Sequence, residues 1–370
     1  MEDNVKKKIN VMQCDGCGAT MLFDPESGSL KCPYCKSTKA INASKDVTER
    51  DFSELQGAEK WKDGIKTVEC PNCGAREVYQ ADEVAKDCPF CGTSMILKME
   101  DISGVKPNVV IPFKITADDA AAECKKWLKG RLFSPGKFKK EVNPEKLQGI
   151  YYPVWTFDSN VITDYHGVLG KHVTRTRSRN GKTETYTTTE YFPVRGQSFD
   201  MFDDIMVNGG NLVDDNTVDA ISFAQGEYVT YSDAYLSGYS ANSYSVEPKD
   251  AWVKAEQKMR EEIKREIMRK HNADVVQSLT MNLYHEGRSF KYMLVPIYVS
   301  TVKWKKKLYR QIVRGTGGKV KGKAPTSPLR VTIAVLLGIA AIVGIYFLFF
   351  ADNALISEGI KQLVSCLPVK

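Results

Sequence analysis

The chain has 370 residues, of which 42% are hydrophobic and 26% charged, so wholesale disorder is excluded and two or three domains with connectors are expected. Residues 1–110 hold 15 basic against 18 acidic residues, whereas residues 301–330 hold ten basic residues and no acid. Because the net charge of +7 comes from that one run, the composition disfavours a nucleic-acid-binding surface along the whole chain.

Eight of the ten cysteines form four CxxC pairs in two units of identical spacing. The pairs of a unit are separated by 14 residues, and the second unit repeats the first with an offset of 56 residues. The units contain Cys14, Cys17, Cys32 and Cys35, and then Cys70, Cys73, Cys88 and Cys91. A tetrahedral Zn²⁺ ion takes four thiolates, and each CxxC turn presents two of them to one side of the ion. The sequence therefore predicts two four-cysteine zinc ribbons and two Zn²⁺ ions, with metal binding supplying folding energy to units too small to bury much core.

Other uses of paired cysteines fit less well. Disulfide bonds are unexpected in a cytosolic chain without an N-terminal secretory signal. A thioredoxin-like centre would have one pair rather than four. An iron–sulfur cluster stays an alternative, because thiolates also bind iron, and an interleaved pairing of the CxxC motifs stays open. Cys124 lies in a helical pattern and is expected to be a buried apolar residue.

The CxxC motifs resemble zinc ribbons of the general transcription factor IIB type and the paired CxxC elements of primosomal helicases. The resemblance covers about 90 residues, and it implies binding of DNA, RNA or protein, or bracing of a fold. A zinc ion with four thiolates carries a charge of −2, so residues 1–110 would become more acidic on loading. That charge opposes binding to a phosphate backbone. We expect a protein partner, with nucleic acid less favoured.

The predicted fold class is multidomain: two small four-cysteine zinc ribbons, an α+β domain with an antiparallel sheet, and one C-terminal transmembrane helix. The predicted order is ribbon 1 at 1–40, a linker at 41–64, ribbon 2 at 65–100, the α+β domain at 111–314, a basic Gly/Pro linker at 315–330, the transmembrane helix at 331–350 and a short tail at 351–370.

Three segments of the α+β domain have helical patterns. Thr116 and Asp119 form a capping-box pattern that opens a helix ending before Gly130. An apolar stripe predicts a long helix from Pro248 to about His271. Four tyrosines at helical spacing predict a further helix, either packed on the sheet or presenting an aromatic docking face: Tyr228, Tyr231, Tyr235 and Tyr239.

Alternating aromatic and β-branched residues predict the strands. The expected strands are 151–157, 161–168, 186–192, 274–283, 290–302 and 307–313. Asn180-Gly181 is a hairpin turn signal. Proline cannot donate a ladder hydrogen bond, so the four prolines in strand-like runs are expected at edge strands, strand starts or bulges: Pro112, Pro153, Pro193 and Pro296.

No catalytic constellation is recognisable. None of the four histidines stands at zinc-ligand spacing beside a carboxylate: His166, His172, His271 and His285. The stretch from Arg314 to Lys319 lacks the GxxxxGK[ST] spacing of a phosphate-binding loop. We therefore expect no enzymatic activity, and helicase activity does not follow from the resemblance.

Residues 331–350 are an uncharged apolar run of 20 residues, long enough for a helix to span roughly 30 Å of hydrocarbon. A buried core helix would normally show a polar face. Basic residues precede the run, so the bulk of the chain is expected in the cytoplasm with a single pass through the cell membrane. The segment Lys303–Arg330 is expected to bind anionic lipid headgroups.

The overall order resembles a group of uncharacterised bacterial membrane-bound zinc-ribbon proteins. Together with the acidic ribbon half and the basic membrane-proximal run, it leads us to expect a membrane-anchored, non-catalytic zinc-binding adaptor or scaffold that recruits a cytosolic protein partner. A nucleic-acid-binding or helicase-associated protein is the alternative.

Overall fold

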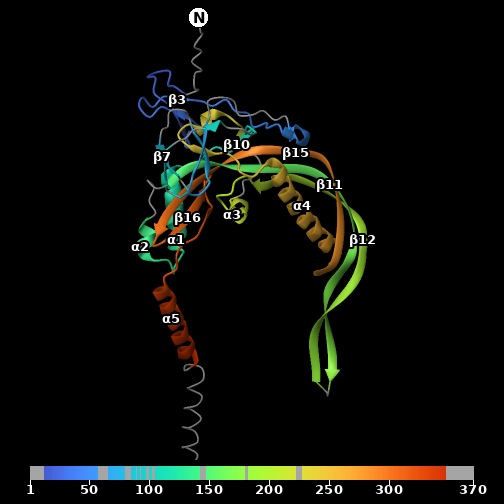
Figure 1. Ribbon diagram of the computed structural model, residues 1–370. Coiled ribbons are helices and arrows are strands. Elements are labelled where there is room, and N and C mark those ends of the chain that lie inside the picture. The colour runs from blue at the N-terminus through green and yellow to red at the C-terminus, as the bar shows by residue number, and fades with distance from the viewer. Residues whose placement is uncertain are drawn as a thin grey trace, which may run out of the picture.

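The main body of the protein is a curved sheet that arches over a long helix (Figure 1). The computed structural model describes residues 12–56, 66–79, 85–88, 90–91, 93–96, 100–101, 105–141, 147–179, 182–221 and 227–346. Three long strands run through the arch: β11 (Leu147–Arg179), β12 (Lys182–Asn208) and β15 (Val275–Trp304). β11 lies between the other two and pairs antiparallel with both.

These strands are longer than the sequence predicts. The expected strands 151–157 and 161–168 are parts of β11, and 274–283 and 290–302 are parts of β15. The prediction that each pair forms two separate strands was wrong, because the chain between the segments makes a register shift and not a turn. A β-bulge inserts an extra residue without ending the strand, so a local turn signal such as Gly287, with φ of +58°, stays inside the sheet.

Next to Asp158, β11 shifts its register against both neighbouring strands. Against β12 the register shifts between Phe157 and Ser159, and against β15 it shifts between Asp158 and Asn160. Asp204 on β12 adopts φ of +57° at this place. Because a bulge bends its strand and increases the twist, shifts that coincide on three adjacent strands contribute to the curvature of the arch.

The helix under the arch is α4 (Pro248–Lys270), which lies on the concave side of the sheet (Figure 1). Proline begins it, and it ends one residue before His271, as predicted. The apolar stripe is buried against the sheet and comprises Trp252, Ala255, Met259, Ile263 and Ile267. The charged residues of α4 face away, which explains how so polar a sequence forms a core helix.

One end of the arch is built from α1 (Ala117–Lys129), α2 (Gly136–Glu141) and β16 (Lys307–Arg314), which pairs with β15. The capping box is confirmed: the Thr116 side chain accepts from the backbone of Asp119, whose carboxylate accepts from the backbone of Thr116. Cys124 is buried in α1, as expected for an apolar role, and burial raises its pKa to about 11.

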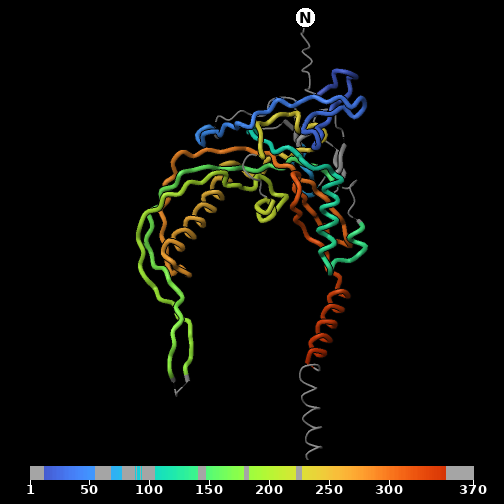
Figure 2. The backbone as a smooth tube through the Cα atoms, turned by 180° about the vertical axis from the view of Figure 1, so that it is seen from behind, coloured from blue at the N-terminus to red at the C-terminus, as the bar shows by residue number. Residues whose placement is uncertain are grey.

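The first zinc-ribbon segment lies at the top of the arch in Figures 1 and 2, and the second joins the edge of the main sheet. The first contains β1 (Leu22–Asp24), β2 (Ser29–Lys31) and β3 (Thr38–Lys39). The second contains β5 (Lys66–Glu69), β6 (Arg76–Tyr79), β7 (Ala85–Asp87), β8 (Ser94–Ile96) and β9 (Glu100–Asp101).

Short elements complete the main sheet, which is mixed rather than purely antiparallel. β10 (Val109–Val110) pairs parallel with β15, and β14 (Ser240–Asn242) pairs parallel with β11. The remaining elements are β4 (Arg50–Asp51), η1 (Phe52–Gln56), α3 (Asp215–Ala220), β13 (Val229–Thr230), η3 (Asp233–Leu236) and β17 (Val320–Gly322).

The prolines of the strands occupy positions where a missing N–H is tolerated. Pro193 lies in β12, which pairs only with β11 within the described residues and is an edge strand there. Pro153 separates the β14 pairing from the β12 pairing along one side of β11. Pro296 likewise separates the β10 and β16 pairings along one side of β15. The edge position was predicted, whereas the exchange of partners inside the sheet was not.

The helix predicted over the four tyrosines does not form. Tyr228 to Tyr239 instead contains β13 and the single turn η3. Tyr235 is buried, and its ring lies 5.3 Å from the ring of Phe23 in the first ribbon. The segment is therefore neither a helix packed on the sheet nor a free docking face, and it holds the first ribbon instead.

Neither predicted linker is free chain where the structure describes it. Within 41–64, Arg50 and Asp51 form β4 and pair with β15. Within 315–330, β17 pairs with β16, so the sheet extends to Gly322. Helix α5 (Pro328–Tyr346) then leaves the body, with none of its residues buried. Residues 347–350 and the tail 351–370 lie outside the described residues, as do Asn180 and Gly181 between the paired Arg179 and Lys182.

Candidate metal centres

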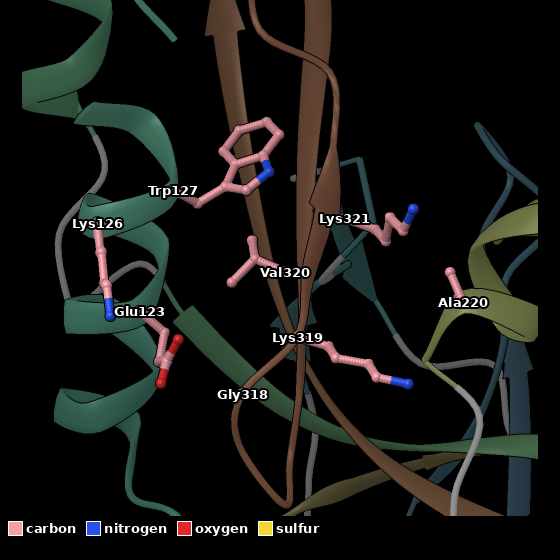
Figure 3. Close-up of a pocket in the computed structure, with 8 residues that line it drawn as sticks. All are labelled: Glu123, Lys126, Trp127, Ala220, Gly318, Lys319, Val320 and Lys321. Atoms are coloured by element: carbon pink, nitrogen blue, oxygen red, sulfur yellow. The ribbon is translucent and has the colours of Figure 1, made fainter. Parts of the chain in front are cut away.

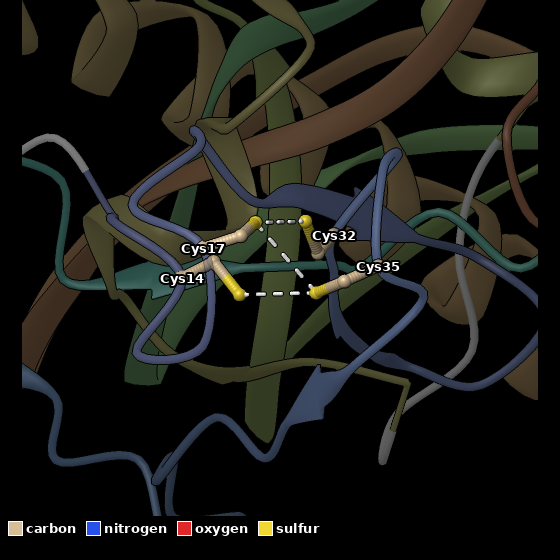
Figure 4. A group of neighbouring side chains, drawn as sticks. All are labelled: Cys14, Cys17, Cys32 and Cys35. Carbon is tan, nitrogen blue, oxygen red and sulfur yellow. Dashed lines mark hydrogen bonds between the residues drawn. The ribbon is translucent and has the colours of Figure 1, made fainter.

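The four cysteines of the first unit point their sulfur atoms toward one another (Figure 4). Cys14 Sγ lies 3.4 Å from Cys35 Sγ, and Cys17 Sγ lies 3.5 Å from Cys32 Sγ. Thiolates bound to Zn²⁺ at about 2.3 Å in a tetrahedron are separated by roughly 3.8 Å. A disulfide would need about 2.05 Å. The spacing therefore fits a shared metal ion and not a disulfide.

The second unit repeats this geometry. Cys70 Sγ lies 3.6 Å from Cys91 Sγ, and Cys73 Sγ lies 3.5 Å from Cys88 Sγ. In each unit the four sulfurs lie within 4.8 Å of one another. The two four-cysteine clusters are thus positioned to bind two zinc ions, and the pairing is within each repeat, which excludes the interleaved alternative.

Backbone amides of the CxxC turns point at the sulfurs, as zinc knuckles require. The amides of Ala19 and Ala75 donate to the second cysteine of their pairs, Cys17 and Cys73. The residue after this cysteine adopts the left-handed conformation in three knuckles, with φ of +74° at Gly18, +69° at Gly74 and +64° at Lys36. Gly92, which follows Cys91 in the fourth knuckle, lies outside the described residues.

A hydroxyl at the same place in each repeat was missed by the sequence analysis. Ser37 Oγ lies 3.0 Å from Cys14 Sγ and 3.1 Å from Cys35 Sγ. Its counterpart, Thr93, has its Oγ1 3.2 Å from Cys91 Sγ. Both hydroxyls follow the last cysteine of their unit by two residues, so the extended pattern CxxCx(S/T) was the available signal.

These contacts favour the thiolate form that a metal needs. The Ser37 hydroxyl first, and the Gly16 amide next, lower the pKa of Cys14 to about 6. Burial raises the pKa of Cys91, but the stronger combined effect of its bonds to Thr93 and Asn72 lowers it to about 6. A deprotonated sulfur is the ligand for Zn²⁺, so part of the ligand set is prepared for metal before it binds.

The two centres differ in how they attach to the body. Ribbon 1 rests on the segment after η3, where the Phe23 amide donates to Ser237 O and the Ser237 hydroxyl donates to Met21 O. Ribbon 2 continues the main sheet through the pairing of β6 with β14. Arg310 and Thr301 also donate to the Phe90 carbonyl inside the Cys88–Cys91 knuckle.

A partly buried ion cluster joins the segment between the ribbons to the arch. Lys291 Nζ on β15 lies 2.6 Å from Glu49, 2.9 Å from Asp204 and 3.3 Å from Asp158. Burial would lower the pKa of Lys291, but its carboxylate partners raise it. Burial raises the pKa of Asp158 to about 6. Lys291 is therefore the cation that pairs with the carboxylates of this cluster and holds the three segments together.

A shallow pocket of about 400 Å³ lies between α1, the β16–β17 hairpin and the end of α3 (Figure 3). Its wall residues are Glu123, Lys126, Trp127, Ala220, Gly318, Lys319, Val320 and Lys321. Three lysines against one glutamate favour an anion, and these eight residues include no pairing of a nucleophile with a base. One ring nitrogen of each of three histidines contacts a hydroxyl of another residue: His172 Nδ1, His271 Nε2 and His285 Nδ1.

The basic run 303–330 is divided among different surroundings. Arg310 donates to carbonyls of Phe90 and Leu212, and Arg314 pairs with Glu227. Lys319 and Lys321 line the pocket. The binding of this run to anionic lipid headgroups stays a prediction.

Comparison with known proteins found one relative of nearly the same extent. The protein named "Uncharacterized protein YdjG" from Bacillus subtilis strain 168 is 27% identical over 325 residues, which covers 85% of this chain and 90% of that protein. No family model and no solved structure matches the chain. The similarity covers most of the chain rather than one ribbon, and the resemblance to transcription factor IIB and primosomal ribbons stays a prediction.

Proposed function

We propose that this protein is a membrane-anchored, non-catalytic zinc-binding scaffold that recruits a cytosolic protein partner through its ribbons. The observation that carries the proposal is the arrangement of the first ribbon and α5: ribbon 1 lies at the top of the body, and α5 leaves the body at the opposite side, below α1 and α2 (Figures 1 and 2). A body anchored by α5 would present the first zinc centre on the side away from the lipid.

Helix α5 supports the membrane part of the proposal. It has 19 residues and a mean hydropathy of 2.2, and the rest of the described chain buries none of it. An apolar helix of this length without a protein cover needs an apolar solvent, which a bilayer supplies. Arg330 and the lysines of the β15–β16 turn precede it, so the body belongs on the cytoplasmic side.

The outer surface of ribbon 1 supports the proposed recruitment of a protein partner. Tyr34 lies inside the second knuckle and is 80% exposed, and the neighbouring Cys35 is also exposed. Exposed aromatic residues on a rigid, metal-braced turn are typical anchors of protein interfaces. The negative charge of the loaded zinc–thiolate centres favours a partner with basic or neutral contacts over a phosphate backbone.

The test uses the full chain, cross-linked in native membranes and purified in detergent with its zinc. We expect Tyr34→Ala to lower partner recovery by about tenfold or more, as loss of an anchor does, while Tyr186→Ala on the distant β12 leaves recovery unchanged. The wild-type chain should also resist alkaline carbonate extraction. Partner recovery that is unchanged by Tyr34→Ala would contradict the proposal. Release of the chain from membranes by carbonate would contradict it as well.

A second candidate function, nucleic-acid binding, has one specific observation in its favour. Beyond Gly170 the hairpin of β11 and β12 has no third strand among the described residues and projects from the arch. On β11, the positions of Lys171, Arg175 and Arg177 lie on one face of this hairpin. A filter-binding titration with single-stranded DNA discriminates, because phosphate contacts give affinity that falls steeply with salt.

A further inference from the structure

The chain presents exposed apolar side chains where α5 leaves the body. The loop between α1 and α2 contains Leu132, which is 73% exposed, and Phe133, which is 43% exposed. At the adjoining start of β16, Leu308 is 45% exposed. Large apolar residues that gather at one end of a protein usually mark a contact surface.

The loop is fastened to the first turn of α5. The Ser327 amide donates to Phe133 O at 2.7 Å. The Arg330 guanidinium donates to Leu132 O at 3.1 Å and to Ser134 O at 2.8 Å. These bonds use the backbone carbonyls of the loop and leave the Leu132 and Phe133 side chains exposed beside the start of the apolar helix.

The β15–β16 turn is held at the same end by aromatic packing. Phe138 of α2 is buried, and its ring lies 5.7 Å from Trp304 and 5.4 Å from Tyr309. We call residues 129–140 and 303–308 together the foot. Because α2 joins the loop to the turn, the foot is one surface rather than two separate loops.

The foot is strongly basic. Its sequence contains nine lysine and arginine residues and no aspartate or glutamate. Apolar side chains surrounded by lysines match the chemistry of an anionic membrane surface, where the apolar groups enter the headgroup–acyl boundary and the ammonium groups stay among the phosphates.

We propose that the foot is a membrane-inserting surface, in which Leu132 and Phe133 enter the interface of the bilayer that holds α5 while the surrounding lysines bind anionic headgroups. This inference rests on the proposed membrane anchoring by α5. The occupant is lipid rather than protein because the foot is continuous with the apolar helix and complementary in charge to anionic lipid. The consequence is a fixed orientation of the body above the membrane.

The test places a photo-reactive benzoylphenylalanine at Phe133 or, as control, at Tyr34 of the full chain reconstituted in vesicles of phosphatidylcholine and phosphatidylglycerol. We expect lipid adducts at 133 and none above background at 34. With Lys137→Glu added, adducts at 133 should fall several-fold, whereas Lys249→Glu on α4 should leave them unchanged.

The outcomes separate this inference from the anchoring itself. A chain that resists carbonate extraction but gives equal adducts at 133 and 34 overturns the membrane-inserting foot and leaves the anchor intact. An adduct yield at 133 that is unchanged by Lys137→Glu overturns the proposed contact between the lysines and anionic headgroups. A chain released by carbonate overturns the anchoring proposal, and the inference falls with it.

Discussion

At the scale of single residues, the zinc knuckles show how backbone conformation limits the sequence. The position after the second cysteine has positive φ in three described knuckles, and two of them use glycine. Lys36 takes this conformation with a side chain, which costs about 1–2 kcal/mol for an L-residue. The Lys36 ammonium donates to Pro33 O at 2.8 Å and recovers part of that cost.

We expect Lys36→Gly to stabilise ribbon 1 by about 0.5–1 kcal/mol, because glycine removes the strain although it adds entropy to the unfolded chain. Competition with a zinc chelator measures this as slower metal loss. Gly18→Ala is the matched control: an added Cβ there meets nothing within 4 Å, so only the backbone cost of about 1 kcal/mol remains. Faster zinc loss from Lys36→Gly would contradict the account.

The two four-cysteine clusters are also a residue-scale result that the sequence predicted. Their spacing alone identifies them, because a CxxC turn has one local geometry whatever surrounds it. Ser37 and Thr93 were not predicted, since a hydroxyl near a cysteine has no meaning until the fold brings the sulfurs of two knuckles around it.

At the scale of elements, the two ribbons have different relations to the sheet. Ribbon 1 touches the body through Phe23, Tyr235 and Ser237. Ribbon 2 shares the sheet through β6 and β14, and Phe90 is buried in the core that contains Ile297 and Ile312. The loss of metal from the second centre should therefore destabilise more of the body than the loss of metal from the first.

We expect Cys70→Ser to lower the thermal stability of the whole body, and Cys14→Ser to release ribbon 1 while the body keeps its melting temperature. The reason is that zinc supplies the folding energy of each ribbon, and only ribbon 2 supplies strands to the main sheet. Circular dichroism together with limited proteolysis separates the effects. Equal melting temperatures for both variants would show that ribbon 2 is not part of the same cooperative unit.

At the scale of the whole molecule, the arch depends on groups that are distant in the sequence. Lys291 joins Glu49, between the ribbons, to Asp158 and Asp204 on the long strands. The cluster lies where the registers of β11, β12 and β15 shift. It therefore connects the curvature of the sheet to the position of the ribbon segments above it.

The raised pKa of Asp158, about 6 against an ordinary value of 3.8, predicts a pH dependence. The native carboxyl holds its proton more tightly than the unfolded one, so this group adds stability at low pH and loses it as pH rises from about 4 to about 6. Compared with Asp158→Asn, the wild-type chain should gain up to about 3 kcal/mol between pH 7 and pH 4.

Chemical unfolding of both chains across that range checks the sign. Contributions from groups that do not interact with Asp158, including the zinc ligands, are common to both chains and cancel in the difference. A difference in unfolding free energy that stays constant with pH would mean that the pKa of Asp158 is the same in the native and the unfolded chain.

The sequence by itself determined the features that depend on local chemistry: the two sets of four cysteine ligands, the capping box of α1, the extent of α4 and the apolar helix α5. Each rests on spacing within one segment, and short-range geometry is enough to fix it. Tertiary structure alone decided that the expected short strands join into an arch, that Tyr235 contacts the first ribbon, and that described residues of both expected linkers pair with the sheet. Those outcomes depend on which distant backbones pair, and hydrogen bonds between segments far apart in the chain leave no periodic pattern in either one.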